Sequence, residues 1–200
     1  TPRRVLYELP SYTYTYGDTP SSLPFVATFW NVLPWDQGRV FAGEIGIASG
    51  ETLGDRLSAG TYSLVMKELR DFTGGNYFID AESLLNQPIL TVNPRPLTWR
   101  VGSSFSTYGA DTFSLPPVFP DTPFAETDLT FEVAITDAQG RPFTTRSLPG
   151  NYVSRVVALG GSAASNYVLQ AEGSTPGVHV HNPRPVYFQV PDLTVTYGDW

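Results

Sequence analysis

The stretch Ile89–Asp111, ILTVNPRPLTWRVGSSFSTYGAD, carries two short motifs that recur on both sides of it. The Pro-Arg-Pro motif at 94–96 returns at 183–185, and a related Pro-Arg pair stands at 2–3. The Thr-Tyr-Gly motif at 107–109 returns at 196–198 and is also present at 15–17. Both motifs keep an interval of 92 residues on one side and 89 on the other, which is typical of a tandem duplication. The sequence therefore predicts modules at 1–93 and 94–182, with 183–200 as the start of a third module or as closing strands.

Apolar residues alternate with polar ones at the start of each predicted module, and this period of two predicts a strand with one buried face. The apolar positions are Val5, Tyr7 and Leu9, then Leu97, Trp99 and Val101, then Val186, Phe188 and Val190. The chain also has 18 glycines and 18 prolines, which argue against long helices. We therefore expect an all-β chain.

An immunoglobulin-like β-sandwich is the preferred fold, because about seven short strands are expected in each module. The sequence LSAGTY at 57–62 has the spacing of a tyrosine corner, in which the hydroxyl returns to nearby backbone, and LPGNY at 148–152 repeats it one residue shorter. A turn followed by a buried tyrosine is the alternative for this motif. For the fold, the alternative is a β-grasp-like module with one short helix, which applies if Asp80–Asn86 and Asn31–Gly38 prove helical.

Composition excludes several functional classes. The chain has no cysteine, which removes thiol nucleophiles and cysteine-based metal sites. Its net charge of −7, without a basic run, argues against nucleic-acid binding. No apolar run approaches the roughly 20 residues that span a bilayer. The chain starts at a module boundary without a signal sequence, so we interpret it as a segment of a longer protein.

The ordered set of motifs resembles the MBG-type repeats of bacterial secreted surface adhesins. Its elements are TYGD at 15–18, AGTY at 59–62, GNYFI at 75–79, LTV at 90–92 and PRPLT at 94–98, and the resemblance covers nearly the whole chain twice. The second copy departs from the pattern at Ala110, Pro149 and Ser165. The resemblance implies a long bacterial adhesin, secreted or anchored at the surface, in which such repeats form a stalk.

Two histidines are the only residues of their type, at His179 and His181. Their spacing places both rings on one face of a strand, as in half of a metal site, with Asp192 or Glu172 as a third ligand. The preferred interpretation is instead two exposed polar residues on an edge or seam strand. Catalysis by a Ser-His-Asp set is not expected, because no accompanying motif is present.

Two further groups of residues are considered as binding sites. Asp18, Asp111 and Asp199 follow the Tyr-Gly turns and could bind Ca²⁺ at module junctions, although aspartate is also an ordinary turn residue. Phe29, Trp30 and Trp35 form an aromatic group that could stack a sugar, or could fill and cover the core of the first module.

The preferred function is therefore a non-catalytic stalk or spacer of a large extracellular bacterial adhesin, which projects a binding region from the cell surface. The alternative is a module that binds carbohydrate or a host protein. We expect no catalytic residue, no cofactor, no bound nucleic acid and a monomer whose partners are other modules of its parent protein.

Overall fold

The fold is seen in a computed structural model that describes residues 1–37, 41–71 and 74–198. Strands dominate, which confirms the predicted all-β class. The helix within the described ranges is the 3-10 helix η1 (Ser162–Asn166), which the sequence did not predict. No helix in these ranges is long and apolar enough to cross a bilayer.

The first nine strands lie between Arg3 and Leu97. They are β1 (Arg3–Arg4), β2 (Leu6–Glu8), β3 (Tyr12–Thr15), β4 (Thr28–Trp30), β5 (Phe41–Ile47), β6 (Gly60–Asp71), β7 (Tyr77–Phe78), β8 (Ile89–Asn93) and β9 (Arg95–Leu97). The later strands are β10 (Trp99–Val101), β11 (Ser104–Thr107), β12 (Val118–Pro120), β13 (Thr130–Thr136), β14 (Gly150–Gly160), β15 (Tyr167–Leu169) and β16 (Gly177–Asn182).

Contacts group the described chain into two compact units. Unit 1 comprises Thr1–Trp99, Pro120–Glu132 and Ala158–Ser174, and unit 2 comprises Arg100–Phe119, Val133–Val157 and Thr175–Trp200. Because neither unit is one continuous stretch, this grouping does not test the predicted boundaries after residues 93 and 182, which stay predictions.

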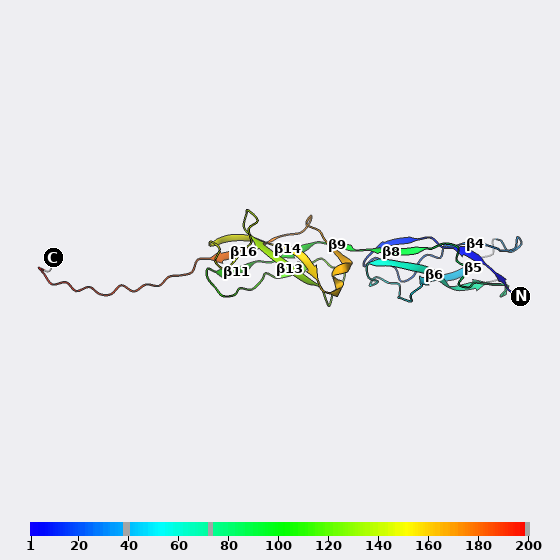
Figure 1. Ribbon diagram of the computed structural model, residues 1–200, viewed down its shortest axis with the longest axis horizontal. Coiled ribbons are helices and arrows are strands. Elements are labelled where there is room, and N and C mark those ends of the chain that lie inside the picture. The colour runs from blue at the N-terminus through cyan, green and yellow to red at the C-terminus, as the bar shows by residue number, and fades with distance from the viewer. Residues whose placement is uncertain (38–40, 72–73, 199–200) are drawn as a thin grey trace. The chain divides into compact units, whose positions relative to one another are not determined.

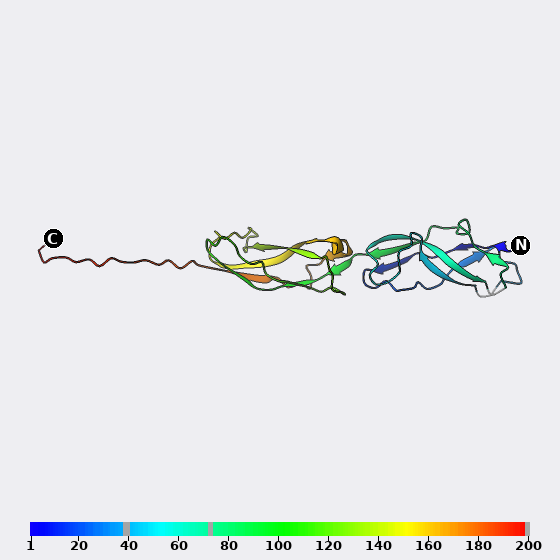
Figure 2. The same ribbon diagram turned by 90° about the horizontal axis from the view of Figure 1, so that it is seen from below.

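Unit 1 contains a four-stranded sheet with the order β3-β8-β6-β5. Strand β8 is parallel to β3 and antiparallel to β6, and β5 and β6 lie side by side (Figures 1 and 2). A bulge between Glu44 and Ile45 interrupts the pairing of β5 with β6. The shorter pairs in this unit are β1 with β7, β2 with β4, and β9 with β15.

The second four-stranded sheet repeats this scheme, with most of its residues in unit 2. Its order is β11-β16-β14-β13, and β16 is again parallel to one neighbour, β11, and antiparallel to the other, β14. Strand β16 is therefore a central strand of its sheet, paired on both sides.

The predicted buried faces of the first two modules are confirmed. Val5, Tyr7 and Leu9 are at most 3% exposed, and Leu97, Trp99 and Val101 are at most 6% exposed. Residues 183–198 form no strand, and Val186, Phe188 and Val190 are each more than 70% exposed. Alternation alone did not bury this third set, because none of the described strands pairs with it.

The helical segments on which the β-grasp alternative depends are not found in the described residues. Residues 80–86 form turns and an isolated bridge, and residues 31–37 form a bend and a turn. Gly38 lies outside the described residues. In the first segment the Ser83 hydroxyl bonds Asp80, so short side chain-to-backbone contacts replace a helical turn.

Both predicted tyrosine corners make the expected hydrogen bond. The Tyr62 hydroxyl donates to the carbonyl of Ser58 at 2.8 Å, and the Tyr152 hydroxyl donates to that of Leu148 at 2.6 Å. In each case the acceptor lies four residues earlier. The one-residue deletion in the second copy therefore preserves the contact.

Candidate functional site

The turn at Thr15–Gly17 is the point around which the best-defined polar and aromatic cluster of unit 1 is built. Tyr16 follows β3, and its amide donates to the carbonyl of Asn93 at the end of β8 (2.9 Å). Gly17 has a φ of 90°, which side chains other than glycine's rarely allow. A Cβ at Gly17 would also lie 3.1 Å from Pro123. A close approach of two segments therefore requires this glycine.

The Tyr16 ring is covered by residues that are distant in sequence, and it is only 3% exposed. Its ring meets that of Phe124 edge-on at 5.8 Å between centroids, and that of Tyr167 edge-on at 5.4 Å. Such edge-to-face pairs contribute about 0.5–1.5 kcal/mol each beyond the area that they bury.

A single carboxylate oxygen accepts hydrogen bonds from two tyrosines at this site. Tyr16 donates to Oε1 of Glu126 at 3.1 Å, and Tyr167 makes a short hydrogen bond to the same atom. Burial, together with the negative charge of Glu126, raises the pKa of Tyr16. Burial and the hydrogen bond to Glu126 likewise raise the pKa of Tyr167. Both hydroxyls therefore stay protonated as donors.

Two arginines complete the cluster from the side of the Tyr-Gly turn. Nη1 of Arg95 donates to the carbonyl of Tyr16 (3.1 Å) and to Oδ1 of Asp18 (3.0 Å). The guanidinium of Arg56 lies over the Phe124 ring, 4.5 Å from its centroid, in cation–π geometry. The Pro-Arg-Pro motif therefore supplies a side chain that holds the turn next to it.

A last contact comes from the residue that precedes Tyr167. Oδ1 of Asn166 accepts the amide of Ala59 at 2.8 Å. Each polar atom named in the cluster is thus engaged by another residue of unit 1. This arrangement can hold segments together, but it offers no activated nucleophile and no unoccupied set of ligands.

Among the described residues, the aspartates considered for Ca²⁺ at the Tyr-Gly turns are not part of a ligand set. Asp18 is paired with Arg95, and Asp111 is exposed, whereas Asp199 lies outside the described residues. No group of three or more histidines and carboxylates suited to a metal occurs in the described part of the chain. The ion pair with Arg95 ties Asp18 to the turn, as is common for a turn aspartate.

The expectation that His179 and His181 are exposed, on an edge or seam strand, is wrong about the exposure and about the edge. They are 0% and 1% exposed, and they lie on the central strand β16 of the second sheet. Ser104 and Ser106 on β11 face them: Ser104 bonds Nδ1 of His179 at 2.7 Å. Ser106 bridges Nε2 of His179 and Nδ1 of His181, both at 2.7 Å.

This buried chain of serines and histidines is structural in character. Burial, and then the neighbouring His181, lowers the pKa of His179, so its neutral ring is favoured. The rings pack against Phe143 at 4.5 and 4.9 Å between centroids. A substrate cannot reach rings that are sealed from solvent. The other suggested ligands, Glu172 and Asp192, are exposed.

The aromatic group of the first module is divided between the core and the surface. Phe29 packs on Phe25 and Phe41, as the core interpretation predicted. Trp30 is 40% exposed, and Trp35 is 73% exposed at a cavity of about 490 Å³. Trp35 is therefore the more exposed of the two and lines that cavity, so it is the better placed to stack on a ligand.

Sequence reasoning missed Glu126, Ser104 and Ser106. One usable signal for Glu126 was spacing: Tyr167 lies 41 residues after it, and Tyr77, which donates to Asp36 at 2.7 Å, also lies 41 residues after its acceptor. The repeated pair of acid and tyrosine was visible in the sequence, although its contact was not.

Comparison of the chain with protein-family models, with curated proteins and with solved structures returned no match.

Proposed function

We propose that this chain is a non-catalytic stalk or spacer of a large extracellular bacterial adhesin. In this proposal, MBG-type modules with an immunoglobulin-like sandwich fold follow one another along the polypeptide. The observation that carries it is the cluster at Tyr16, where a repeated turn motif is held by the arginine of a repeated proline motif and covered by Phe124, Glu126 and Tyr167. Because the residues of this cluster hold separate segments of the chain together, they suit a mechanical role.

Two further observations support a repeated spacer. The two four-stranded sheets have the same order and the same pattern of parallel and antiparallel neighbours. Strand β8 ends at Asn93 and β9 begins at Arg95, with Pro94 between them. Proline fixes φ and biases the residue before it towards extended backbone, so the connection is short and stiff.

A double-mutant cycle on the full chain tests the role of the cluster. Tyr16→Phe removes a hydrogen bond to a carboxylate, and we expect a loss of about 1–2 kcal/mol in unfolding free energy. Combining it with Glu126→Gln should give a coupling energy of at least about 0.5 kcal/mol. Tyr108→Phe is the matched control, because Tyr108 occupies the same motif but makes no hydroxyl hydrogen bond with the described residues. Additive effects of Tyr16→Phe and Glu126→Gln would contradict the proposal.

A second candidate function is carbohydrate binding at the exposed Trp35. Its cavity of about 490 Å³ is also lined by Arg3, Asp36 and Asn76, which combines an aromatic surface with polar groups. A glycan array probed with the full chain separates the two functions. A spacer gives no signal, whereas a signal that Trp35→Ala abolishes and Trp30→Ala preserves would favour binding.

A further inference from the structure

The second Tyr-Gly turn has the backbone hydrogen bonds of the first. The amide of Tyr16 donates to the carbonyl of Asn93 at 2.9 Å, and the amide of Tyr108 donates to that of Asn182, also at 2.9 Å. These contacts lie in unit 1 and unit 2 respectively. The two tyrosines therefore leave equivalent strands at equivalent points.

The glycines and arginines of the two turns also correspond. The amide of Gly17 donates to Asp55 at 3.1 Å, and that of Gly109 donates to Thr145 at 2.7 Å. Nη1 of Arg184 donates to the carbonyl of Gly109 at 3.2 Å, as Arg95 does to the turn in unit 1. Backbone hydrogen bonds and one arginine therefore hold the second turn as they hold the first.

The two turns differ in what covers them. Tyr16 is 3% exposed beneath Phe124, Glu126 and Tyr167, whereas Tyr108 is 42% exposed. The Tyr108 hydroxyl makes no hydrogen bond with the residues that the structure describes. An aromatic ring held in the same backbone arrangement is thus left without the cover that its equivalent has.

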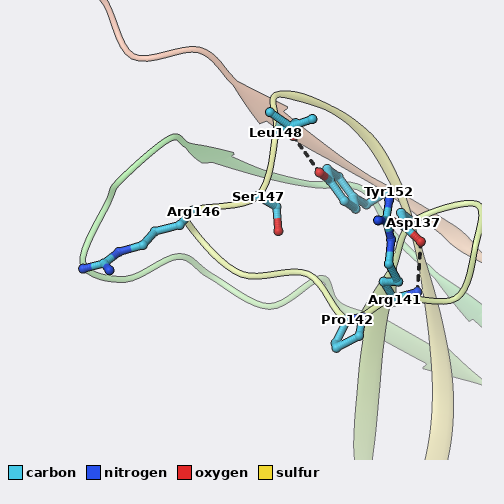
Figure 3. Close-up of a pocket in the computed structure, with 7 residues that line it drawn as sticks. All are labelled: Asp137, Arg141, Pro142, Arg146, Ser147, Leu148 and Tyr152. Carbon is cyan, nitrogen blue, oxygen red and sulfur yellow. Dashed lines mark hydrogen bonds and ion pairs between the residues drawn. The ribbon is translucent and has the colours of Figure 1, made fainter.

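Arg146, beside the second turn, is the counterpart of Arg56 and also lacks the contact that its counterpart makes. Arg56 precedes the corner tyrosine Tyr62 by six residues and lies over Phe124, and Arg146 precedes Tyr152 by the same number. In Figure 3 the Arg146 side chain extends away from the other labelled residues of the cavity. No ion pair links it to another described residue. We call Tyr108, Arg146 and Arg184 the uncovered turn face.

The N-terminal end of unit 1 carries residues that correspond to those that cover Tyr16. The Tyr77 hydroxyl donates to Oδ2 of Asp36 at 2.7 Å, which repeats the pair of Tyr167 and Glu126 at the same separation of 41 residues. Trp35 stands next to Asp36 and is 73% exposed. The cavity of about 490 Å³ that these residues line, with Arg3, has the volume to receive an aromatic side chain.

We propose that the uncovered turn face docks the Trp35–Asp36–Tyr77 end of a second copy of this chain. Tyr108 enters the cavity beside Trp35 and Tyr77, as Tyr16 lies between Phe124 and Tyr167. The positive charges of Arg146 and Arg184 complement the carboxylate of Asp36. The contact is heterologous, because the two surfaces that meet are different, so one copy can bind a partner at each of its two surfaces. The inference rests on the proposed function, since the same contact would join successive modules of one polypeptide.

The contact is expected to be weak between separate molecules. Modules joined by a short linker face each other at effective concentrations in the millimolar range. A contact whose dissociation constant between separate molecules is about 1 mM is therefore enough to keep linked modules docked. Sedimentation of the full chain from about 10 μM to about 1 mM should show a monomer at the low end. The weight-average mass should roughly double at the high end, because each assembly keeps one free surface of each kind. This rise should be lost in high salt.

Variants distinguish this contact from general stickiness. Tyr108→Ala and Trp35→Ala should each remove the concentration-dependent rise in mass, since each removes one side of the contact. An equimolar mixture of the two variants should restore association, as a heterodimer, because each variant retains the side that the other lacks. Phe105→Ala is the matched control: Phe105 is 65% exposed and lies outside the uncovered turn face.

Three outcomes would overturn the inference: a wild-type chain that stays monomeric at about 1 mM, a mixture that does not associate, or a Phe105→Ala variant that is impaired like Tyr108→Ala. None of these affects the coupling of Tyr16 to Glu126 within one chain. Loss of that coupling, with self-association intact, would instead refute the proposed function alone.

Discussion

Acidification is expected to destabilise the second sheet through the buried His179. The ring is 0% exposed, and its hydrogen-bond partners among the described residues are the hydroxyls of Ser104 and Ser106. The titratable groups beside it are His181 on its own strand and Tyr152 on β14, and the rings of Phe143 and Phe113 also pack against it. No carboxylate of the described residues bonds the ring, so nothing nearby compensates a proton that it gains.

The sign and size of the effect follow from linkage. The pKa of His179 is lowered below its ordinary value of 6.5 in the folded protein, chiefly by burial. Well above pH 6.5 the ring is neutral in both states, and stability does not depend on it. Below that pH the unfolded chain binds the proton first, so the unfolding free energy falls by up to about 1.4 kcal/mol per pH unit. At pH 5 the loss from this one residue is at most about 2 kcal/mol. The loss stops growing once the pH is below the folded-state pKa.

Urea denaturation followed by circular dichroism between pH 7.5 and 5 measures how the unfolding free energy depends on pH. Hydrogen exchange of the β16 amides shows whether the loss of stability arises at this strand. His179→Leu is the informative variant, because the equivalent position of the first sheet is Leu90, which is also 0% exposed. The variant loses hydrogen bonds and is expected to be less stable at pH 7.5, but its dependence on pH should be shallower. Asp128 and Glu51, whose pKa values are lowered from 3.8 and 4.5, titrate below this range. An unchanged slope in His179→Leu would refute the reasoning.

Two further predictions concern the backbone and the tyrosine corners. Gly177→Ala places a Cβ against the carbonyl oxygen of Gly102, closer than van der Waals contact, and should lower the unfolding free energy by about 1–3 kcal/mol in urea denaturation. Gly60→Ala is its control, since the nearest atom would lie at 3.6 Å, and an equal loss in both would contradict the prediction. Tyr152→Phe should cost about 1 kcal/mol, because it leaves a backbone carbonyl without its donor. The same change at the less buried Tyr62 should cost less, and a larger loss there would show that burial does not set the cost.

Much of the fold could be predicted because local pattern and burial agree. Val5, Tyr7 and Leu9 alternate with polar residues, and all three are buried. The two tyrosine corners were predicted from spacing, and each hydroxyl reaches the backbone four residues earlier. The same alternation at Val186 and Phe188 did not produce buried residues. A period of two specifies which side chains share a face, but a partner strand must cover that face.

The candidate site was harder to predict. The alternation in His179-Val-His181 places both rings on one face, which is correct, but it does not say whether the strand is central or at an edge. That depends on β11 and β14, which come from distant parts of the sequence and pair on either side of β16. With Ser104 and Ser106 opposite them, burial of two imidazoles becomes possible because three of their four ring nitrogens find partners, while Nε2 of His181 has none among the described residues.

The sequence by itself determined the strand class, the repeated Tyr-Gly and Pro-Arg motifs, and the absence of cysteine chemistry, because these depend on local geometry and composition. Only the tertiary structure decided that Tyr16 is covered while Tyr108 is exposed, although their motifs and backbone hydrogen bonds correspond. The reason is physical: a turn motif specifies how its own backbone folds. The exposure of its side chain depends on Phe124, Glu126 and Tyr167, which lie more than a hundred residues away in the chain.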